Sequence, residues 1–138
     1  MKFTEQFNKY ACVGDSIRLR ISDDVSVVAK IIADNDRKPG DFDCYTEADI
    51  CRWRRDEWFF CAVSLSLEVN RREIKEQLDS LWGVECNYGE DNSYLTEVAN
   101  ELLNDCGFDE IVAALKDTAR AARAGVKAIE AFEKEASK

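Results

Sequence analysis

The side chains of this 138-residue chain that could do covalent or acid-base chemistry are six cysteines and 28 carboxylates, and there is no histidine. Without histidine, neither a Ser-His nor a Cys-His nucleophile can form. Cys51 is the thiol most favoured as a thiolate, because Arg52 lies beside it, but no general base accompanies it. No two cysteines form a C-x-x-C pair, so a zinc site would need four of them from dispersed segments. The sequence therefore predicts no catalytic residue, no metal site and no cofactor.

Carboxylate-only catalysis is the enzymatic alternative, because two neighbouring carboxyl groups can act as acid and base. The sequence does not show which carboxylates lie together, so this metal-independent enzyme would have no assigned residues. A calcium loop starting at Asp34 is excluded, since Lys38 and Pro39 stand where a ligand and the turn glycine are needed. We therefore expect a protein that binds rather than one that catalyses.

The acidic residues are concentrated in one part of the chain. Segment 76–115 contains ten Asp and Glu residues and no Lys or Arg, within a chain of formal net charge −9. Three of these carboxylates recur every four residues and therefore share one face of a helix. Such a row is either a solvated face or a surface for a basic groove, which nucleic-acid-binding proteins use for phosphates. The predicted partner-binding acidic face consists of Glu90, Asp91, Glu97, Glu101 and Asp105.

A basic and aromatic surface on the sheet is the alternative binding site. The alternation of apolar and polar residues places Arg18, Arg20, Lys30 and Trp58 on the same side of neighbouring strands. This combination can hold phosphates and stack single-stranded bases, as in small RNA or single-stranded DNA binding modules. In a competing interpretation, Trp58 lies beneath the short helix that precedes it. The net negative charge weighs against direct nucleic-acid binding, because phosphates are repelled.

The strands that would carry these residues are recognised by period-2 alternation. Apolar residues on every second position predict a hairpin over 16–33 and a strand over 57–69 with one face in the core. Segment 71–80 is compatible with a helical turn or an extended excursion, and 81–87 is predicted as a further strand.

Helices are recognised by capping residues and by a 3.6-residue period. A capping-box pattern at Thr46 predicts a short helix over 46–55. A stripe of apolar residues after Asn92 predicts a helix that ends at Gly107, and a last helix runs over 108–134.

Together these elements predict an α+β fold, an antiparallel sheet of about three to five strands with two C-terminal helices and one short inserted helix. The length is close to the ~100–150 residues of a typical domain, so we expect a single domain over 1–138. Residues 1–92 would be mainly β and 93–138 helical, with a frayed C-terminus. No segment has the apolar length of a membrane span, and no secretion signal precedes the first strand, so we expect a cytoplasmic protein.

The last predicted helix carries an apolar seam with spacings that alternate between four and three residues, which is a heptad pattern. Small residues in its middle permit close approach of another helix. Two occupants remain open: the preceding helix of the same chain, or a second copy in a homodimer. The seam consists of Phe108, Val112, Leu115, Ala119, Ala122, Val126 and Ile129.

Three blocks of the sequence occur in a recognisable order: CRWRRDEW at 51–58, SLWGVE at 80–85, and Tyr94-Leu95 followed by Glu97, Ala99, Glu101 and Leu102. Over residues 41–104, the chain resembles small acidic proteins carried by phages and integrative elements. The resemblance transfers no catalytic residue, but it implies a protein that acts against host defences, as anti-CRISPR and anti-restriction proteins do.

The charge pattern and this resemblance lead to one hypothesis. We expect a non-enzymatic inhibitor, most consistent with an anti-CRISPR protein, in the cytoplasm of a host cell. Its acidic face would mimic DNA and occupy the basic groove of a host protein or ribonucleoprotein complex.

Overall fold

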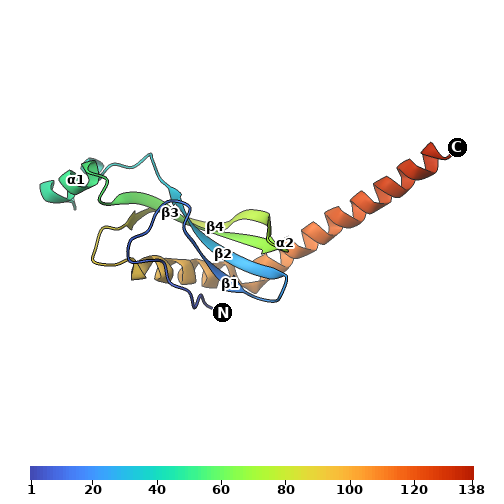
Figure 1. The fold of residues 1–138 in the computed structure, drawn as a ribbon, viewed down its shortest axis with the longest axis horizontal. Coiled ribbons are helices and arrows are strands. Elements are labelled where there is room, and N and C mark those ends of the chain that lie inside the picture. The colour runs from blue at the N-terminus through green and yellow to red at the C-terminus, as the bar shows by residue number, and fades with distance from the viewer. The chain divides into compact units, whose positions relative to one another are not determined.

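The computed structural model describes residues 1–138 and has an α+β fold (Figure 1). Four strands form one antiparallel sheet in the order β1-β2-β3-β4. The predicted fold class is confirmed, and the number of strands lies within the predicted range. The elements are β1 (Ser16–Arg20), β2 (Val25–Ala33), the 3-10 helix η1 (Pro39–Asp41), α1 (Glu47–Arg54), β3 (Phe59–Val69), β4 (Arg72–Cys86) and α2 (Ser93–Ala136).

The chain forms two compact units, unit 1 over Met1–Cys106 and unit 2 over Gly107–Lys138. Helix α2 contributes to both, but it is interrupted at Gly107, where φ is 68° and ψ is 174°. Glycine adopts this positive φ without the steric penalty that other residues have. The predicted helix end at Gly107 is therefore confirmed, and α2 consists of two helical segments, 93–106 in unit 1 and 108–136 in unit 2.

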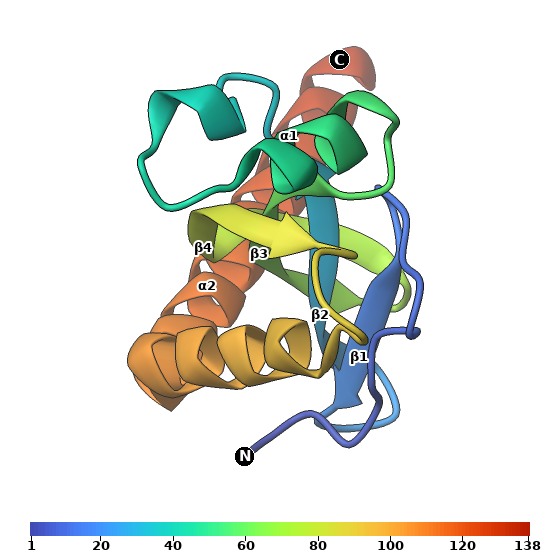
Figure 2. The same cartoon turned by 90° about the vertical axis from the view of Figure 1, so that its left-hand side faces the viewer.

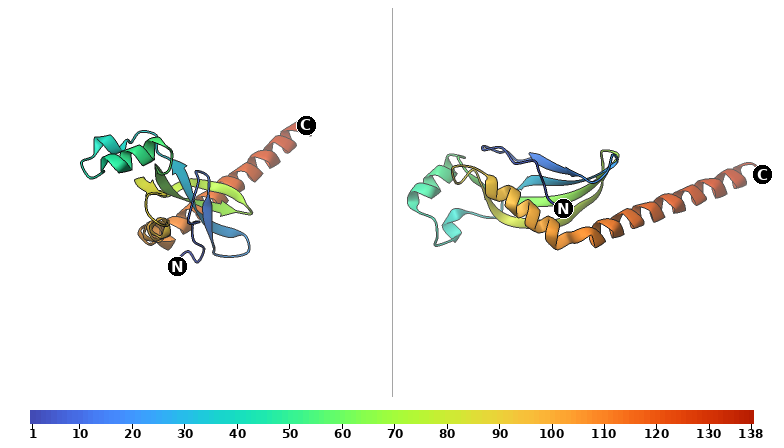
Figure 3. Two further views of the ribbon diagram at one scale, coloured as in Figure 1. Left: turned by 60° about the vertical axis from the view of Figure 1, so that its left-hand side comes forward. Right: turned by 90° about the horizontal axis from the view of Figure 1, so that it is seen from below.

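The core of unit 1 lies between the sheet and segment 93–106, which runs along one face of the sheet (Figure 3). The predicted apolar stripe supplies the helical side, with Leu95, Ala99 and Leu103 fully buried. The N-terminal segment runs beside this helix, because the backbone N–H of Phe3 donates to Asn100 Oδ1 at 2.7 Å and that of Phe7 to Thr96 Oγ1 at 3.2 Å. Both phenylalanines are buried, so residues before the first strand are part of the core.

The predicted core face of β3 is buried, and its other face is buried as well. Phe60, Ala62, Ser64 and Ser66 belong to this second face, and all four are buried. Serine is tolerated there when its hydroxyl is satisfied, and Ser64 Oγ lies 2.8 Å from Ser80 Oγ of β4 in a hydrogen bond.

Strand β4 resolves the ambiguity of segment 71–80, which is extended and continuous with 81–86 in a single 15-residue strand. Its sequence lacks a clean alternation because its register against β3 shifts at three places. Gln77 and Gly83 both have positive φ within the strand. Such β-bulges insert residues and reverse which face a side chain occupies.

Helix α1 lies at the end of the sheet where β3 begins (Figures 1 and 2). Its predicted capping box is present: Thr46 Oγ1 accepts from Asp49 N at 3.1 Å, and Asp49 Oδ2 accepts from Thr46 N at 3.0 Å. The bond from the Thr46 backbone N–H holds the Asp49 carboxylate in its charged form and lowers its pKa. Among all helices, none is long and apolar enough to cross a membrane.

Candidate partner-binding surface

The acidic face is oriented by the apolar stripe on the other side of the same helix. Because segment 93–106 buries Leu95, Ala99 and Leu103 against the sheet, the residues half a turn away must face outward. Glu97, Glu101 and Asp105 are exposed, as predicted. Their spacing of four residues places them in one row along the helix.

The loop before α2 adds the other two predicted carboxylates. Glu90 and Asp91 are both exposed. Asp91 Oδ1 accepts hydrogen bonds from Ser93 N at 3.0 Å and from Ser93 Oγ at 2.8 Å. These bonds stabilise the charged carboxylate and lower the pKa of Asp91. None of the five acidic-face residues takes part in an ion pair of the structure.

A groove lies next to the acidic face in unit 1, with a volume of about 590 Å³. Its helical wall is formed by Tyr94 and Val98, which stand on the same side of the helix as Glu101 and Asp105. No Lys or Arg lines it, whereas three carboxylates do. The lining residues are Leu81, Gly83, Val84 and Glu85 of β4, Tyr88, Gly89, Glu90 and Asp91 of the loop, and Tyr94 and Val98 of α2.

The strand wall of the groove contains a β-bulge. Val84 pairs with Cys61 and Leu81 with Val63, so β4 has one more residue than β3 between these pairs. Gly83 lies in the bulge with φ 73°. Leu81, which lines the groove, is 45% exposed, and the neighbouring Trp82 is 43% exposed.

Loop 34–38 fixes the bulge in place. The buried Asp34 carboxylate accepts through Oδ2 from Gly83 N at 3.0 Å and from Arg37 Nε at 2.9 Å. A β-carbon at position 83 would lie 2.8 Å from Arg37 Cζ. Glycine is favoured there by its positive φ, and a larger residue would also displace the Arg37 guanidinium.

An aromatic cluster of Tyr45, Trp58 and Tyr88 packs next to the groove, which Tyr88 also lines. Tyr45 packs on Trp58 and Tyr88, with ring centroids 5.2 and 5.9 Å away. Tyr45 Oη donates to Glu85 Oε1 at 2.9 Å, which positions a carboxylate in the groove wall. Burial, followed by the bond to Glu85, raises the pKa of Tyr45.

Tyr94, which lines the groove, carries a buried polar atom that no other group of the protein satisfies. Its hydroxyl oxygen is buried and has no hydrogen-bond partner. Burial raises the pKa of Tyr94, so the hydroxyl stays protonated and can both donate and accept. Most buried hydroxyls are paired, so this one is an exception in the core beside the groove.

The alternative nucleic-acid face does not present the predicted combination. The register does place Arg18, Arg20 and Lys30 on one side of the sheet. However, Arg18 Nη2 forms bonds of 2.8 and 3.1 Å to Glu68, and Arg20 Nη2 forms one of 2.7 Å to Asp23.

Trp58, the aromatic residue of that alternative face, is fully buried, and its Nε1 donates to the carbonyl oxygen of Asp49 in α1 at 2.9 Å. It therefore cannot stack on a base, which corrects its assignment as a binding residue. The competing interpretation of the sequence, in which Trp58 lies under the short helix, describes its environment.

The cysteines are placed in two groups. Cys51 is exposed, whereas Cys61 and Cys86 are fully buried. The hydrogen bond between these two thiols, followed by burial, raises the pKa of Cys61, so this thiol is not a nucleophile at neutral pH. No group of three or more His, Cys, Asp or Glu side chains is arranged to hold a metal ion.

Sequence reasoning named five carboxylates that are exposed in the structure, and their role as a binding face stays a prediction, but it missed the groove beside them. Tyr94, Val98 and Glu101 follow an i, i+4, i+7 pattern that puts them on one side of the helix, and this was the available signal. The strand wall carried no such signal, because the bulge at Gly83 depends on Asp34.

Comparison with known proteins gave no match to a family model, to a curated protein or to a solved structure. The geometry of the surface is therefore the basis for assigning a function.

Proposed function

We propose that the protein is a non-enzymatic inhibitor that binds a basic surface of a nucleic-acid-handling defence complex in the cytoplasm of a host cell, as an anti-CRISPR protein would. The observation that carries this proposal is the continuity between the acidic face and an apolar groove without basic residues. The carboxylates supply attraction to Lys and Arg, and the groove supplies the desolvated contact that fixes one orientation.

The electrostatic part of the proposal rests on charges that are available to a partner. Glu97, Glu101 and Asp105 are exposed and outside the ion pairs of the structure, so binding would not first break an intramolecular pair. A row of negative charge raises the rate of encounter with a basic groove and competes there with phosphates. This competition is the proposed mechanism of inhibition.

The groove part of the proposal rests on its chemistry. Tyr88, Tyr94 and Val98 offer apolar surface to the methylene stem of an arginine or lysine side chain. Glu90 and Asp91 at the rim are placed to meet its charged end. A cationic side chain of the partner is therefore the ligand that this groove fits best.

The test begins by capturing the partner with the tagged protein from a host that carries defence systems. The purified partner complex is then assayed for DNA or RNA binding with and without the inhibitor. Charge reversal at Glu97, Glu101 and Asp105 to Lys should abolish competition at physiological salt. The matched control reverses Asp36, Asp41 and Asp43, which are exposed elsewhere in unit 1, so that the net charge changes equally.

A second variant tests the groove separately. Leu81→Arg places a cation of the chain's own at the groove rim and should weaken the complex as strongly as the triple reversal. If the acidic-face variant folds and inhibits undiminished while the control also inhibits, the acidic face is not the working surface. If only Leu81→Arg retains full activity, the carboxylates act without the groove.

A further inference from the structure

The second helical segment, 108–136, carries an apolar seam that a single helix cannot bury by itself. Towards its C-terminal end Val126, Ile129 and Phe132 are 55%, 62% and 73% exposed. Apolar residues exposed in a row on one face of a helix indicate an interaction surface. A lone helix also gains little stability in water, since most helical stability comes from packing of an apolar face. The seam therefore requires an occupant.

The spacing of the seam indicates that this occupant is another helix. From Phe108 to Ile129 the spacing between successive apolar positions alternates between four and three residues without interruption. The average spacing is 3.5 residues. This repeat keeps the seam in contact only with a helix that supercoils around it, whereas a seam fitted to a sheet follows the 3.6-residue period of a straight helix.

The residue types at the seam favour two parallel helices. In heptad terms, the a positions are Val112, Ala119 and Val126, and the d positions are Phe108, Leu115, Ala122 and Ile129. β-branched residues at a and leucine at d favour two-stranded parallel coiled coils. Ala119 and Ala122 lie in the middle of the seam, so the two backbones can approach closely there.

The charges beside the seam select the orientation. The e positions are Asp109, Lys116, Arg123 and Glu130, and the g positions hold no charged residue. In an antiparallel pair that overlaps the whole seam, Lys116 of one copy would lie nearest Arg123 of the other, and Asp109 nearest Glu130. Like charges so placed repel. In a parallel pair each e residue faces an uncharged g residue of the other copy, so this repulsion is absent.

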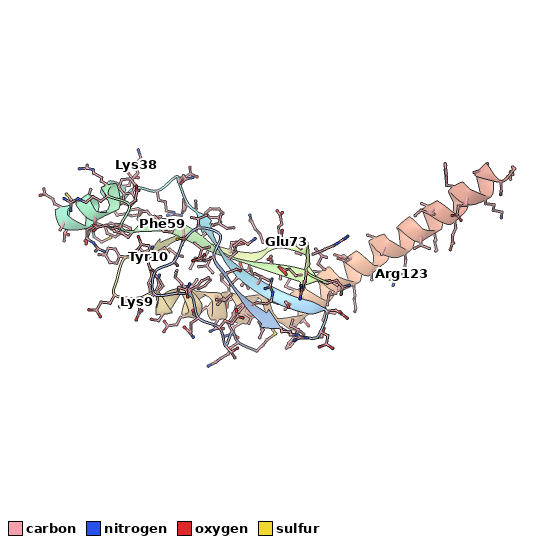
Figure 4. The ribbon with its side chains drawn as sticks, in the orientation of Figure 1. Lys9, Tyr10, Lys38, Phe59, Glu73 and Arg123 are labelled. Atoms are coloured by element: carbon pink, nitrogen blue, oxygen red, sulfur yellow. The ribbon has the colours of Figure 1, made fainter.

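The balance of charge along the chain also favours a second copy as the occupant. Unit 2 has six acidic and six basic side chains and is neutral, whereas unit 1 carries all of the formal charge of −9. A neutral helix can pair with itself, and Arg123, one of its e residues, lies on this helix (Figure 4). We propose that two copies of the protein pair through segment 108–136 as a parallel two-stranded coiled coil.

The first test is the mass of the full chain in solution. Light scattering coupled to size exclusion should give twice the 15.7 kDa of one chain. Val126→Glu should return the mass to that of a monomer, because it buries a charge in the seam. Ala124→Glu, which adds the same charge on the opposite side of the helix, should leave the dimer intact. A monomeric wild type, or equal effects of the two variants, would overturn the proposal.

The second test is the orientation of the pair. Ile129→Cys is introduced after replacement of the exposed Cys12, Cys44 and Cys51 by Ser. A parallel pair should form an intermolecular disulfide at position 129 under mild oxidation, whereas Ala131→Cys, on the outer face, should not. A dimeric mass without cross-linking at position 129 would exclude the parallel arrangement.

Salt separates this inference from the proposed function. Parallel pairing joins two units of net charge −9, so their repulsion is screened and the dimer should tighten as salt is raised. Binding of the acidic face to a basic partner should weaken under the same change. Loss of dimerisation in Val126→Glu with retained inhibition, or the reverse result, would show that only one of the two proposals holds.

Discussion

Unit 1 and unit 2 differ in the contacts that stabilise their secondary structure. Unit 1 has a sheet, a helix and an N-terminal segment around one core, in which Val27, Ile31 and Leu65 are fully buried. Unit 2 is one helix in which every side chain from 116 to 138 is exposed. The structure of unit 1 is therefore stabilised by contacts within the chain. The helix of unit 2 depends instead on contacts with a binding partner.

The two units also differ in how charge is used. Unit 1 contains all of the net charge, and its acidic face leaves like charges next to each other. Unit 2 places opposite charges within reach, as in the pairs Arg120–Asp117 at 3.2 Å and Lys138–Glu135 at 3.2 Å. Neighbouring like charges cost helix stability, and neighbouring opposite charges add to it. The like charges of unit 1 are thus available to a basic partner, whereas the opposite charges of unit 2 stabilise its own helix.

The largest expected difference between the units is the cost of removing an aromatic side chain. Trp58→Ala in unit 1 removes a fully buried ring and its bond to Asp49, so it should lower the free energy of unfolding by about 3–5 kcal/mol. Phe132→Ala in unit 2 should change the unfolding of unit 1 by less than about 0.5 kcal/mol. Urea unfolding followed by circular dichroism measures both. A comparable loss from the two variants would contradict the division of stability described above.

A buried amide should be the next most costly residue to remove. Asn92 accepts through Oδ1 from Asn87 N at 2.9 Å and donates through Nδ2 to the carbonyl oxygens of Asn8 and Lys9, both at 3.1 Å. Asn92→Ala leaves these buried groups unpaired and should cost about 2–3 kcal/mol. The control is Asn104→Ala, an exposed amide in the same unit. Equal unfolding midpoints for the two variants would show that the Asn92 network is not needed for stability.

Alkaline pH should destabilise unit 1 through its partly buried tyrosines. Unit 2 has no tyrosine, so this effect is absent there. The pKa of Tyr45 is raised in the folded state by burial and by its bond to Glu85. The folded chain thus holds a proton that the unfolded chain releases near its ordinary pKa of about 10, and stability is lost as pH rises above that value. Unfolding measured from pH 8 to 11 should show this loss, and Tyr45→Phe should reduce its slope.

The control for this prediction is Tyr10→Phe, because Tyr10 is 65% exposed. A slope that is the same in wild type and Tyr45→Phe would mean that another group causes the alkaline loss.

Local patterns in the sequence predicted those parts of the fold that local forces determine. The hairpin over 16–33, the capping box at Thr46 and the break at Gly107 each follow from alternation, a side-chain bond or a positive φ. Strand β4 was only partly predicted, because its bulge at Gly83 is held by Asp34, which is distant in sequence. The groove was missed for the same reason, since its walls come from three segments.

The smallest predicted effect concerns the acidic row itself. Glu101 lies four residues from both Glu97 and Asp105, so Glu101→Gln removes two like-charge pairs and should raise the stability of unit 1 by about 0.5 kcal/mol at low salt. Glu130→Gln in unit 2 removes instead the favourable spacing to Lys134 and should slightly lower the helicity of segment 108–136.

Thermal unfolding at low and high ionic strength measures the gain from Glu101→Gln, which should disappear when salt screens the row. A gain in stability together with weaker partner binding would mean that unit 1 retains the glutamate for its function, at a cost to the fold. A loss of stability would instead indicate that Glu101 makes a favourable contact within unit 1, and the acidic row would then need no partner to explain it.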